Sequence, residues 1–335
     1  MTEILKITDN TEDLSRAGEI IRGGGLVAFP TETVYGIGAN GLDDAAVRRI
    51  FAAKGRPADN PLILHIAKYE DAEKIGYMNA AARKIAESFW SGPVTVIVNK
   101  RDIVPESVTA GLDTVAIRMP SSKIAARLIE YSGVPIAAPS ANLSGKPSPT
   151  VFRDVYDDMN GRIDMIIDGG SCAIGIESTV VDTTGNVPVI LRPGGITYEQ
   201  LRSVLGRVEV EKHKKEGSAD YKPKSPGMKY KHYAPKAKVI VYEKNPGEKI
   251  AAHLAENLKN GVKTGVFCKN DSDYGCECTI KWGETAEDMA NILFAALRNF
   301  DRMGVAEILC EMPEEGGMGM GVRNRIYKSA GFDIR

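Results

Sequence analysis

The chain has 335 residues, a length that favours two domains over one. Hydrophobic residues make up 43% and charged residues 26%, which is typical of a soluble, globular protein. The formal net charge of −1 gives no global positive field that would attract nucleic acid. No apolar stretch reaches the roughly 18 residues of a membrane span, and we expect no signal peptide. The five scattered cysteines favour reduced thiols in a cytoplasm over a disulfide framework.

Short apolar runs alternate with segments of helical periodicity, which is the pattern of an α/β layer fold. The first predicted helix, 11–22, has its apolar residues on one face and ends at the glycines 23–25. Further helices are predicted over 43–54, 79–90, 121–132 and 197–205. The predicted strands are 26–29, 62–66, 94–98, 115–118, 135–138, 165–168 and 178–182. This number of strands predicts one large twisted sheet with helices.

The character of the sequence changes near residue 207. Residues 207–238 contain ten Lys or Arg, only four Asp or Glu, three prolines and no apolar period. This composition predicts an extended linker. The pattern then restarts with strands at 239–242, 264–267 and 306–312 and helices at 248–260, 284–303 and 321–330. We therefore predict a small βαβαβα unit that forms a second domain.

Several motifs of known chemistry are absent or lie in the wrong context. GIGANG (36–41) matches the dinucleotide fingerprint G-x-G-x-x-G, but that motif should follow a hydrophobic strand directly. Here the polar residues 31–33 intervene, so dinucleotide binding is not favoured. The sequence has no P-loop, H-E-x-x-H or G-x-S-x-G motif. Cys276 and Cys278 form a lone C-x-C, and we predict no metal site in the protein.

Four polar clusters lie beside predicted strands, where α/β sheets place ligand loops. They are FPTETVYG (29–36), KGRPADNPLILHI (54–66), APSANLSGKPSPT (138–150), and IESTVVD (176–182) with LRPGG (191–195). Arg and Lys on a loop stiffened by Gly and Pro can bind phosphates, Arg in a bidentate manner and Lys as a point charge. Each cluster alone could be a capped turn or a solvated loop, and His65 could be a core residue. Together with Arg118 they predict a site with several cations, several hydroxyls and no evident nucleophile.

The chain resembles a known family in these same motifs. TETVYG, KGRPADNPL, WSGPVTVIV, AIRMPSS, APSANLSGKPSPT, IESTVVD and LRPGG, in this order over 12–207, resemble the YrdC-like domain. SPGMKYKHYAPKA (225–237) and the domain after it resemble the Sua5 extension. The resemblance implies a large twisted-sheet YrdC-like catalytic domain over 1–207 and a basic linker over 208–237. A small Rossmann-like βαβ domain, the Sua5 C-terminal domain, would occupy 238–335.

The resemblance also implies a reaction, that of Sua5-type L-threonylcarbamoyladenylate synthases. L-threonine and bicarbonate give a carbamate, which attacks the α-phosphate of ATP and expels pyrophosphate. The product, L-threonylcarbamoyl-AMP, would pass to a tRNA threonylcarbamoyl transferase complex for t6A formation at position 37 of ANN-decoding tRNAs. Mg²⁺ would accompany ATP with few or no protein ligands. Because the substrates carry their own nucleophile, the protein mainly positions them and neutralises charge. Whether tRNA binds directly stays open.

The resemblance assigns residues to both substrates. L-threonine would contact Thr33, His65, Arg118, Ala138 and Ser178, with Arg118 and Ser178 on its carboxylate. ATP would contact Lys54, Arg56, Asn60, Thr114, Ser140, Asn142, Ser148 and Arg192, and Tyr233 would close from the linker. Lys54 and Arg56 would be the catalytic residues. We further expect residues 213–237 to fold back over the pocket as a lid, because KYKHYAP (229–235) interleaves aromatic rings and cations.

Two other functions are weighed against this one. YrdC-like domains present a positively charged concave surface, so the chain could be a module that binds double-stranded RNA. The near-neutral net charge and the clustering of cations around polar pockets favour the enzyme. Carbamoyl transfer from carbamoyl phosphate, as in hydrogenase maturation, is a weaker interpretation because the chain lacks that family's other domains.

Overall fold

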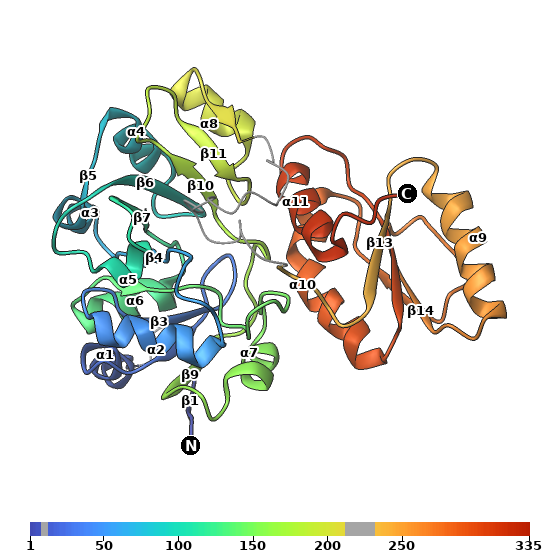
Figure 1. The fold of residues 1–335 in the computed structure, drawn as a ribbon, viewed down its shortest axis with the longest axis horizontal. Coiled ribbons are helices and arrows are strands. Elements are labelled where there is room, and N and C mark those ends of the chain that lie inside the picture. Colours follow the sequence, from blue (N-terminus) through green and yellow to red (C-terminus); the bar gives the residue numbers. More distant parts are fainter. Residues whose placement is uncertain (8–12, 212–231) are drawn as a thin grey trace.

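The described part of the chain forms two β-sheets, and helices pack against each of them (Figure 1). A computed structural model describes residues 1–7, 13–211 and 232–335. Within these residues, one sheet has twelve strands and the other has four. We call the parts of the chain that carry them the first and the second domain. The predicted α/β class is confirmed, and none of the described helices is long and apolar enough to cross a membrane.

The large sheet brings distant parts of the first domain side by side. Its order is β1-β9-β2-β3-β8-β4-β7-β6-β10-β11-β12, and β5 pairs with β6 off this path. Strands β4 and β7 are parallel, and their register places His65 opposite Arg118. The strands are β1 (Glu3–Lys6), β2 (Val27–Phe29), β3 (Gly36–Asn40), β4 (Ile63–His65), β5 (Gly76–Tyr77), β6 (Val94–Lys100), β7 (Thr114–Arg118), β8 (Ile136–Ala137), β9 (Met165–Asp168), β10 (Thr179–Asp182), β11 (Val189–Arg192) and β12 (Glu209–Val210).

The helices of the first domain begin and end at residues suited to those positions. Asp43 caps one of them, α2, by accepting hydrogen bonds from the backbone N–H groups of Ala45 and Ala46. Gly55 ends the same helix at a φ of 60°, so that Lys54 is its last residue. The helices are α1 (Ser15–Arg22), α2 (Asp44–Lys54), α3 (Tyr69–Ile75), α4 (Ala80–Phe89), α5 (Glu106–Thr109), α6 (Lys123–Ser132), α7 (Phe152–Met159) and α8 (Tyr198–Leu205).

The GIGANG stretch forms a strand, β3, rather than a loop that opens a helix. Its glycines allow close packing. A Cβ on Gly38 would lie 2.6 Å from the side chain of Ile136 and 2.8 Å from that of Phe29. This structure agrees with the rejection of the dinucleotide fingerprint, although the strand itself was not predicted. Helix α7 was also missed, because its aspartates favour caps and turns over helix interiors.

The second domain is a parallel sheet with the order β13-β16-β14-β15. Its strands are β13 (Lys238–Tyr242), β14 (Thr264–Cys268), β15 (Cys278–Lys281) and β16 (Glu307–Glu311), and its helices are α9 (Pro246–Lys259), α10 (Ala286–Met303) and α11 (Gly319–Ala330). The predicted alternation is present, with one strand more than predicted. Strand β15 was missed because it is only four residues long and is not buried. The predicted end of the first domain at residue 207 falls before β12, which pairs with β11.

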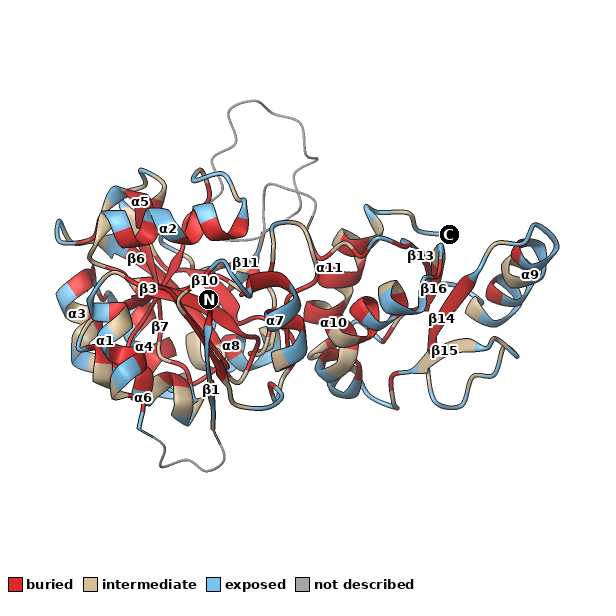
Figure 2. Cartoon of the chain, turned by 90° about the horizontal axis from the view of Figure 1, so that it is seen from below, coloured by how far each residue is buried: buried red, intermediate tan, exposed pale blue. Residues whose placement is uncertain are grey.

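The two domains share a packed interface. Helices α10 and α11 lie between the two sheets, while α9 lies on the far side of the second sheet (Figures 1 and 2). Val34 and Ile176 of the first domain belong to one core cluster with residues of α10 and α11. A Cβ on Gly175, whose φ is 86°, would lie only 2.2 Å from the carbonyl oxygen of Ala290. The interface is therefore packed as closely as a domain core.

Candidate active site

A pocket lies in the first domain, and residues 232 and 233, which follow that domain in the chain, are among its lining residues. Its empty volume is about 650 Å³, which includes the part open to solvent. Eleven of the predicted site residues line it: Thr33, Arg56, His65, Arg118, Ala138, Ser140, Asn142, Ser148, Ser178, Arg192 and Tyr233. Three of the predicted ATP residues, Lys54, Asn60 and Thr114, are not among the lining residues.

A buried ion pair occupies one end of the pocket. Arg118 donates from Nη2 to Oε1 of Glu32 at 2.6 Å and from Nη1 to Oγ1 of Thr33 at 3.0 Å. Burial opposes ionisation of Glu32, but the charge and hydrogen bond of Arg118 outweigh it and lower the pKa of that carboxyl. Nε of Arg118 is buried and has no hydrogen-bond partner among residues 1–7, 13–211 and 232–335. An unsatisfied buried donor of this kind indicates a place for a bound acceptor.

The hydroxyl of Thr33 has a defined direction. Thr31 Oγ1 donates to the carbonyl oxygen of Val34 at 2.7 Å, which uses its only proton. The 2.9 Å hydrogen bond between Thr31 and Thr33 must therefore be donated by Thr33. Since Thr33 also accepts from Arg118, its hydroxyl can only accept a further hydrogen bond from a ligand.

Ser178 and Arg192 form a second fixed group. Nη2 of Arg192 donates to the Ser178 carbonyl oxygen at 2.9 Å and to its Oγ at 3.2 Å. Thr95 Oγ1 lies 2.8 Å from the same Oγ. All three side chains are buried. Arg192 was predicted to contact ATP, yet in this structure its visible role is to orient Ser178.

His65 is neutral at ordinary pH. Its Nδ1 lies 3.2 Å from the carbonyl oxygen of Ile63, which can only accept, so Nδ1 carries a proton. Burial, followed by the nearby charge of Arg118, lowers the pKa of His65 to about 3. The imidazole thus adds no positive charge beside Arg118. His65 is buried, as expected of a core residue, and it also lines the pocket, as expected of a residue that contacts a ligand.

Lys54 does not line the pocket but contacts two residues that do. Its Nζ donates to the carbonyl oxygens of Ser140 and Asn142, the latter at 2.7 Å. Burial, then the charge of Arg56, holds its pKa well below the ordinary value for a lysine. In turn, Ser140 Oγ donates to Asn142 Oδ1 at 2.5 Å. Lys54 therefore fixes the loop that carries Ser140 and Asn142, and its contact with phosphate stays a prediction.

Arg56 is held by its own loop. It lines the pocket, its Nη2 donates to the carbonyl oxygen of Asn60 at 3.2 Å, and its guanidinium lies 5.8 Å from the ring centroid of Phe51. Asn60 itself is fully buried. Thr114 begins β7 and pairs with Asn99. It lies at the opposite end of that strand from Arg118, so its contact with ATP stays a prediction.

Glu177 lines the pocket and was not assigned from the sequence. Its Oε1 accepts from Ser148 Oγ at 2.6 Å, and its Oε2 accepts from Nε of Arg325 at 3.0 Å. Burial opposes ionisation, but Arg325 and Arg192 outweigh it and lower the pKa of Glu177. The signal was a charged residue beside hydroxyls in IESTVVD. Its partner could not be inferred, because Arg325 lies in the other domain.

Two aromatic residues that follow the first domain in the chain, His232 and Tyr233, line the pocket. Tyr233 is buried, has a φ of 63°, and stacks on Phe294 of α10 with 5.1 Å between ring centroids. His232 also lines the pocket, and burial followed by the charge of Arg56 lowers its pKa to about 3. Residues 212–231, which make up most of the predicted lid, lie outside the described residues. Only the end of that segment is seen at the pocket.

The arrangement is suited to binding and orienting more than to covalent catalysis. Ser140 donates its hydroxyl proton to the neutral amide of Asn142, which is not a base, and Ser148 donates to Glu177, which is a weak base because the neighbouring arginines lower its pKa. Within 1–7, 13–211 and 232–335, no three His, Cys, Asp or Glu side chains are grouped to hold a metal ion. Both oxygens of Glu177 already accept protein hydrogen bonds.

Two family models together match almost the whole chain. One, described as telomere recombination and covering the Sua5, YciO and YrdC proteins, matches residues 19–194. The other, described as the C-terminal domain of threonylcarbamoyl-AMP synthase, matches residues 196–331. The threonylcarbamoyl-AMP synthase of Pyrococcus abyssi is 48% identical and covers 100% of this chain and 99% of its own length. That of Bacillus subtilis is 45% identical over 97% of this chain and 95% of its own.

Solved structures extend this similarity to the fold. The structure of P. abyssi Sua5 complexed with L-threonine has a TM-score of 0.94 and 47% identity. The similarity covers 100% of this chain and 98% of that one. YciO of E. coli has a TM-score of 0.52 and 25% identity, and it covers 57% of this chain. The two-domain arrangement is thus shared with the longer relative.

Proposed function

Because the chain belongs to the Sua5 family of threonylcarbamoyl-AMP synthases, we propose that it makes L-threonylcarbamoyl-AMP and pyrophosphate from L-threonine, bicarbonate and ATP. The observation that carries this proposal is the pocket itself. Two of its lining residues are arginines: Arg118, which is buried and has an N–H donor that is unsatisfied within the described residues, and Arg56. Support comes from the relative solved with L-threonine, whose fold matches over the whole chain.

L-threonine would bind at the Arg118 end. Arg118 would pair with the substrate carboxylate, which supplies an acceptor for the unsatisfied Nε, and Ser178 would also hydrogen-bond the carboxylate. Thr33 can only accept, so the side-chain hydroxyl of the substrate is a suitable donor to it. Neutral His65 and the methyl group of Ala138 would complete the walls. Each contact is fixed beforehand by partners inside the first domain.

ATP would bind at the Arg56 end. Arg56 would contact the phosphates and is the residue to which we assign the charge-neutralising role. Lys54 would act by holding the loop with Ser140 and Asn142. Because the protons of Ser140 and Ser148 are already donated, these hydroxyls would accept from ribose hydroxyls, the adenine amino group or metal-bound water. Asn60 would orient Arg56 through its carbonyl oxygen, and Arg192, Thr114 and Tyr233 remain predicted contacts.

The reaction needs orientation and charge neutralisation. Bicarbonate loses hydroxide to give CO₂, and the amino nitrogen of L-threonine bonds to its carbon. The proton that the nitrogen loses combines with the hydroxide to give water, and a carbamate results. A carbamate oxygen then bonds to the α-phosphorus of ATP while the bond to the bridging oxygen of the β-phosphate breaks, and pyrophosphate leaves. Holding both reactants in one pocket replaces an encounter in solution. Arg56 would offset charge that develops on the phosphates, and His232 and Tyr233 would exclude water that hydrolyses the product. Mg²⁺, when bound to ATP, would supply further charge neutralisation.

The product would serve t6A formation at position 37 of ANN-decoding tRNAs in the cytoplasm, after transfer to a tRNA threonylcarbamoyl transferase complex. The test of the activity is exchange of labelled pyrophosphate into ATP by the full-length chain. We expect exchange that requires both L-threonine and bicarbonate. Binding of double-stranded RNA without any such exchange would overturn the proposal and favour an RNA-binding module.

A further inference from the structure

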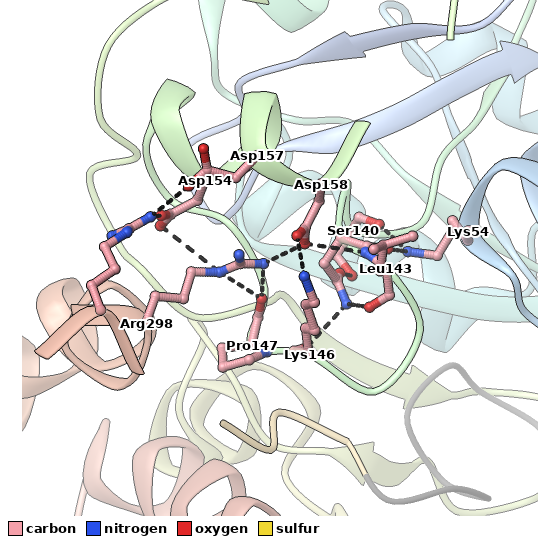
Figure 3. Close-up of polar contacts among 11 residues, drawn as sticks. Lys54, Ser140, Leu143, Lys146, Pro147, Asp154, Asp157, Asp158 and Arg298 are labelled. Carbon is pink, nitrogen blue, oxygen red and sulfur yellow. Dashed lines mark hydrogen bonds and ion pairs between the residues drawn. The ribbon is translucent and has the colours of Figure 1, made fainter. Parts of the chain in front are cut away.

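The second domain contacts the ATP end of the pocket through a buried arginine of α10 (Figure 3). Arg298 donates from Nε and Nη2 to the carbonyl oxygen of Pro147, at 3.1 and 2.6 Å. Its Nη2 also donates to Oδ2 of Asp158 at 2.8 Å. Asp158 accepts in addition from Lys146 Nζ at 2.7 Å and from the backbone N–H of Leu143 at 3.2 Å. Arg298 therefore holds residues 143–147 at both ends.

A second arginine, on α11, is connected to the next residue of that loop, Ser148, through Glu177. Arg325 is fully buried and donates from Nε to Glu177 Oε2 at 3.0 Å, while Ser148 donates to the other oxygen of Glu177. Its Nη1 donates to the carbonyl oxygen of Pro193. Without Arg325, a buried carboxylate would face a pocket that we propose for a triphosphate. An uncompensated negative charge there would repel the phosphates and would be costly to bury.

We infer that Arg298 and Arg325 are positioning residues through which the second domain sets the affinity of the pocket for ATP, an inference that rests on the proposed function. Residues 143–148 carry Ser148 and follow Ser140 and Asn142 directly. From outside the first domain, Arg298 contacts Pro147 directly, Arg325 acts on Ser148 through Glu177, and the backbone N–H of Ala234 donates to the carbonyl oxygen of Gly145 at 3.0 Å. The Arg118 end differs, because Arg118, Thr33 and His65 find their hydrogen-bond partners within the first domain. Loss of either arginine should therefore weaken ATP binding and leave threonine binding largely intact.

The first test compares Arg298→Ala with a matched control, Arg323→Ala. Arg323 lies on α11 and forms its ion pairs with Glu243 and Glu315 inside the second domain, so it controls for loss of an arginine there. KM for ATP is measured by pyrophosphate exchange, and Kd for L-threonine by calorimetry without ATP. We expect Arg298→Ala to raise KM for ATP at least tenfold and to change Kd for L-threonine by less than twofold. Arg298→Lys, which keeps the charge but loses the bidentate geometry, should fall between the wild type and Arg298→Ala.

The second test isolates the charge of Glu177. Arg325→Gln should raise KM for ATP, and the double variant Glu177→Gln with Arg325→Gln should recover part of that loss because the unpaired carboxylate is gone. A role confined to stability would lower the melting temperature and affect both substrates alike. Equal effects of Arg298→Ala and Arg323→Ala on KM for ATP, or no recovery in the double variant, would overturn the inference. Absence of threonine-dependent exchange in the wild type would instead overturn the proposed function.

Discussion

Acidification from pH 7 to pH 5 should destabilise the first domain, and His65 should account for a defined share of the loss. The pKa of His65 is lowered from 6.5 to about 3 by burial, then by Arg118, while the nearby Glu32 acts in the opposite direction. Between these two values the unfolded chain binds a proton that the native state does not. Stability therefore rises with pH across this window and falls on acidification. Each pH unit below 6.5 costs about 1.4 kcal/mol, so the cost at pH 5 is about 2 kcal/mol.

Urea unfolding at pH 7, 6 and 5 measures this cost. Substitution Trp282→Phe leaves Trp90 of the first domain as the sole tryptophan, so its fluorescence reports on that domain. His65→Asn keeps an N–H that can reach the carbonyl oxygen of Ile63 but has no proton to gain. The difference in unfolding free energy between variant and parent at pH 7 measures the loss of packing. The change in that difference toward pH 5 measures the cost of protonating His65. A variant whose unfolding free energy falls as steeply as that of the parent would refute a buried neutral His65.

Three further predictions concern the substrates and the interface. Arg56→Ala should lower kcat/KM for ATP by roughly 10- to 150-fold, which corresponds to the loss of a charge-assisted contact of about 1.5–3 kcal/mol. Calorimetry should show unchanged threonine binding. Unaltered kinetics would place Arg56 on a solvated loop. Serine should be a poor substrate and valine a worse one in the exchange assay, because valine has no hydroxyl to donate to Thr33, and equal turnover of valine and threonine would contradict the threonine site. Gly175→Ala should lower the melting temperature, since its Cβ would meet the backbone of Ala290, whereas Gly247→Ala, which has open space around it, should not.

The sequence predicted the larger features of the fold because they depend on local patterns. Helix α2, for example, follows from Asp43 as a cap and Gly55 as a stop, and both act within a few residues. Strands β5 and β12 have two residues each and were not predicted, because so short a segment shows no period. The linker between residues 207 and 238, predicted from its charge and its prolines, stays a prediction, because residues 212–231 lie outside the described residues.

The site was predictable as a set of motifs but not as a set of contacts. His65 and Arg118 stand in separate motifs, and only the register of β4 and β7 makes them neighbours. The phosphate contact of Lys54 stays a prediction, and the sequence could not show that its Nζ also donates to carbonyl oxygens 86 and 88 residues away. Glu177 was missed because the residue that keeps it ionised, Arg325, lies 148 residues later. Contacts of this range depend on tertiary packing, which a single sequence does not display.

The central claim is that one pocket joins L-threonine, bicarbonate and ATP. It is tested most directly by incubating the full-length chain with ¹⁴C-bicarbonate, L-threonine and ATP and separating the products by chromatography with mass spectrometry. The account predicts a single new species that contains the bicarbonate label, threonine and AMP, formed together with pyrophosphate. Arg118→Ala should form none of it, because the group that would hold the threonine carboxylate is gone. A labelled product whose formation releases ADP and phosphate in place of pyrophosphate would contradict the account. A labelled adenylate that forms without threonine would also contradict it.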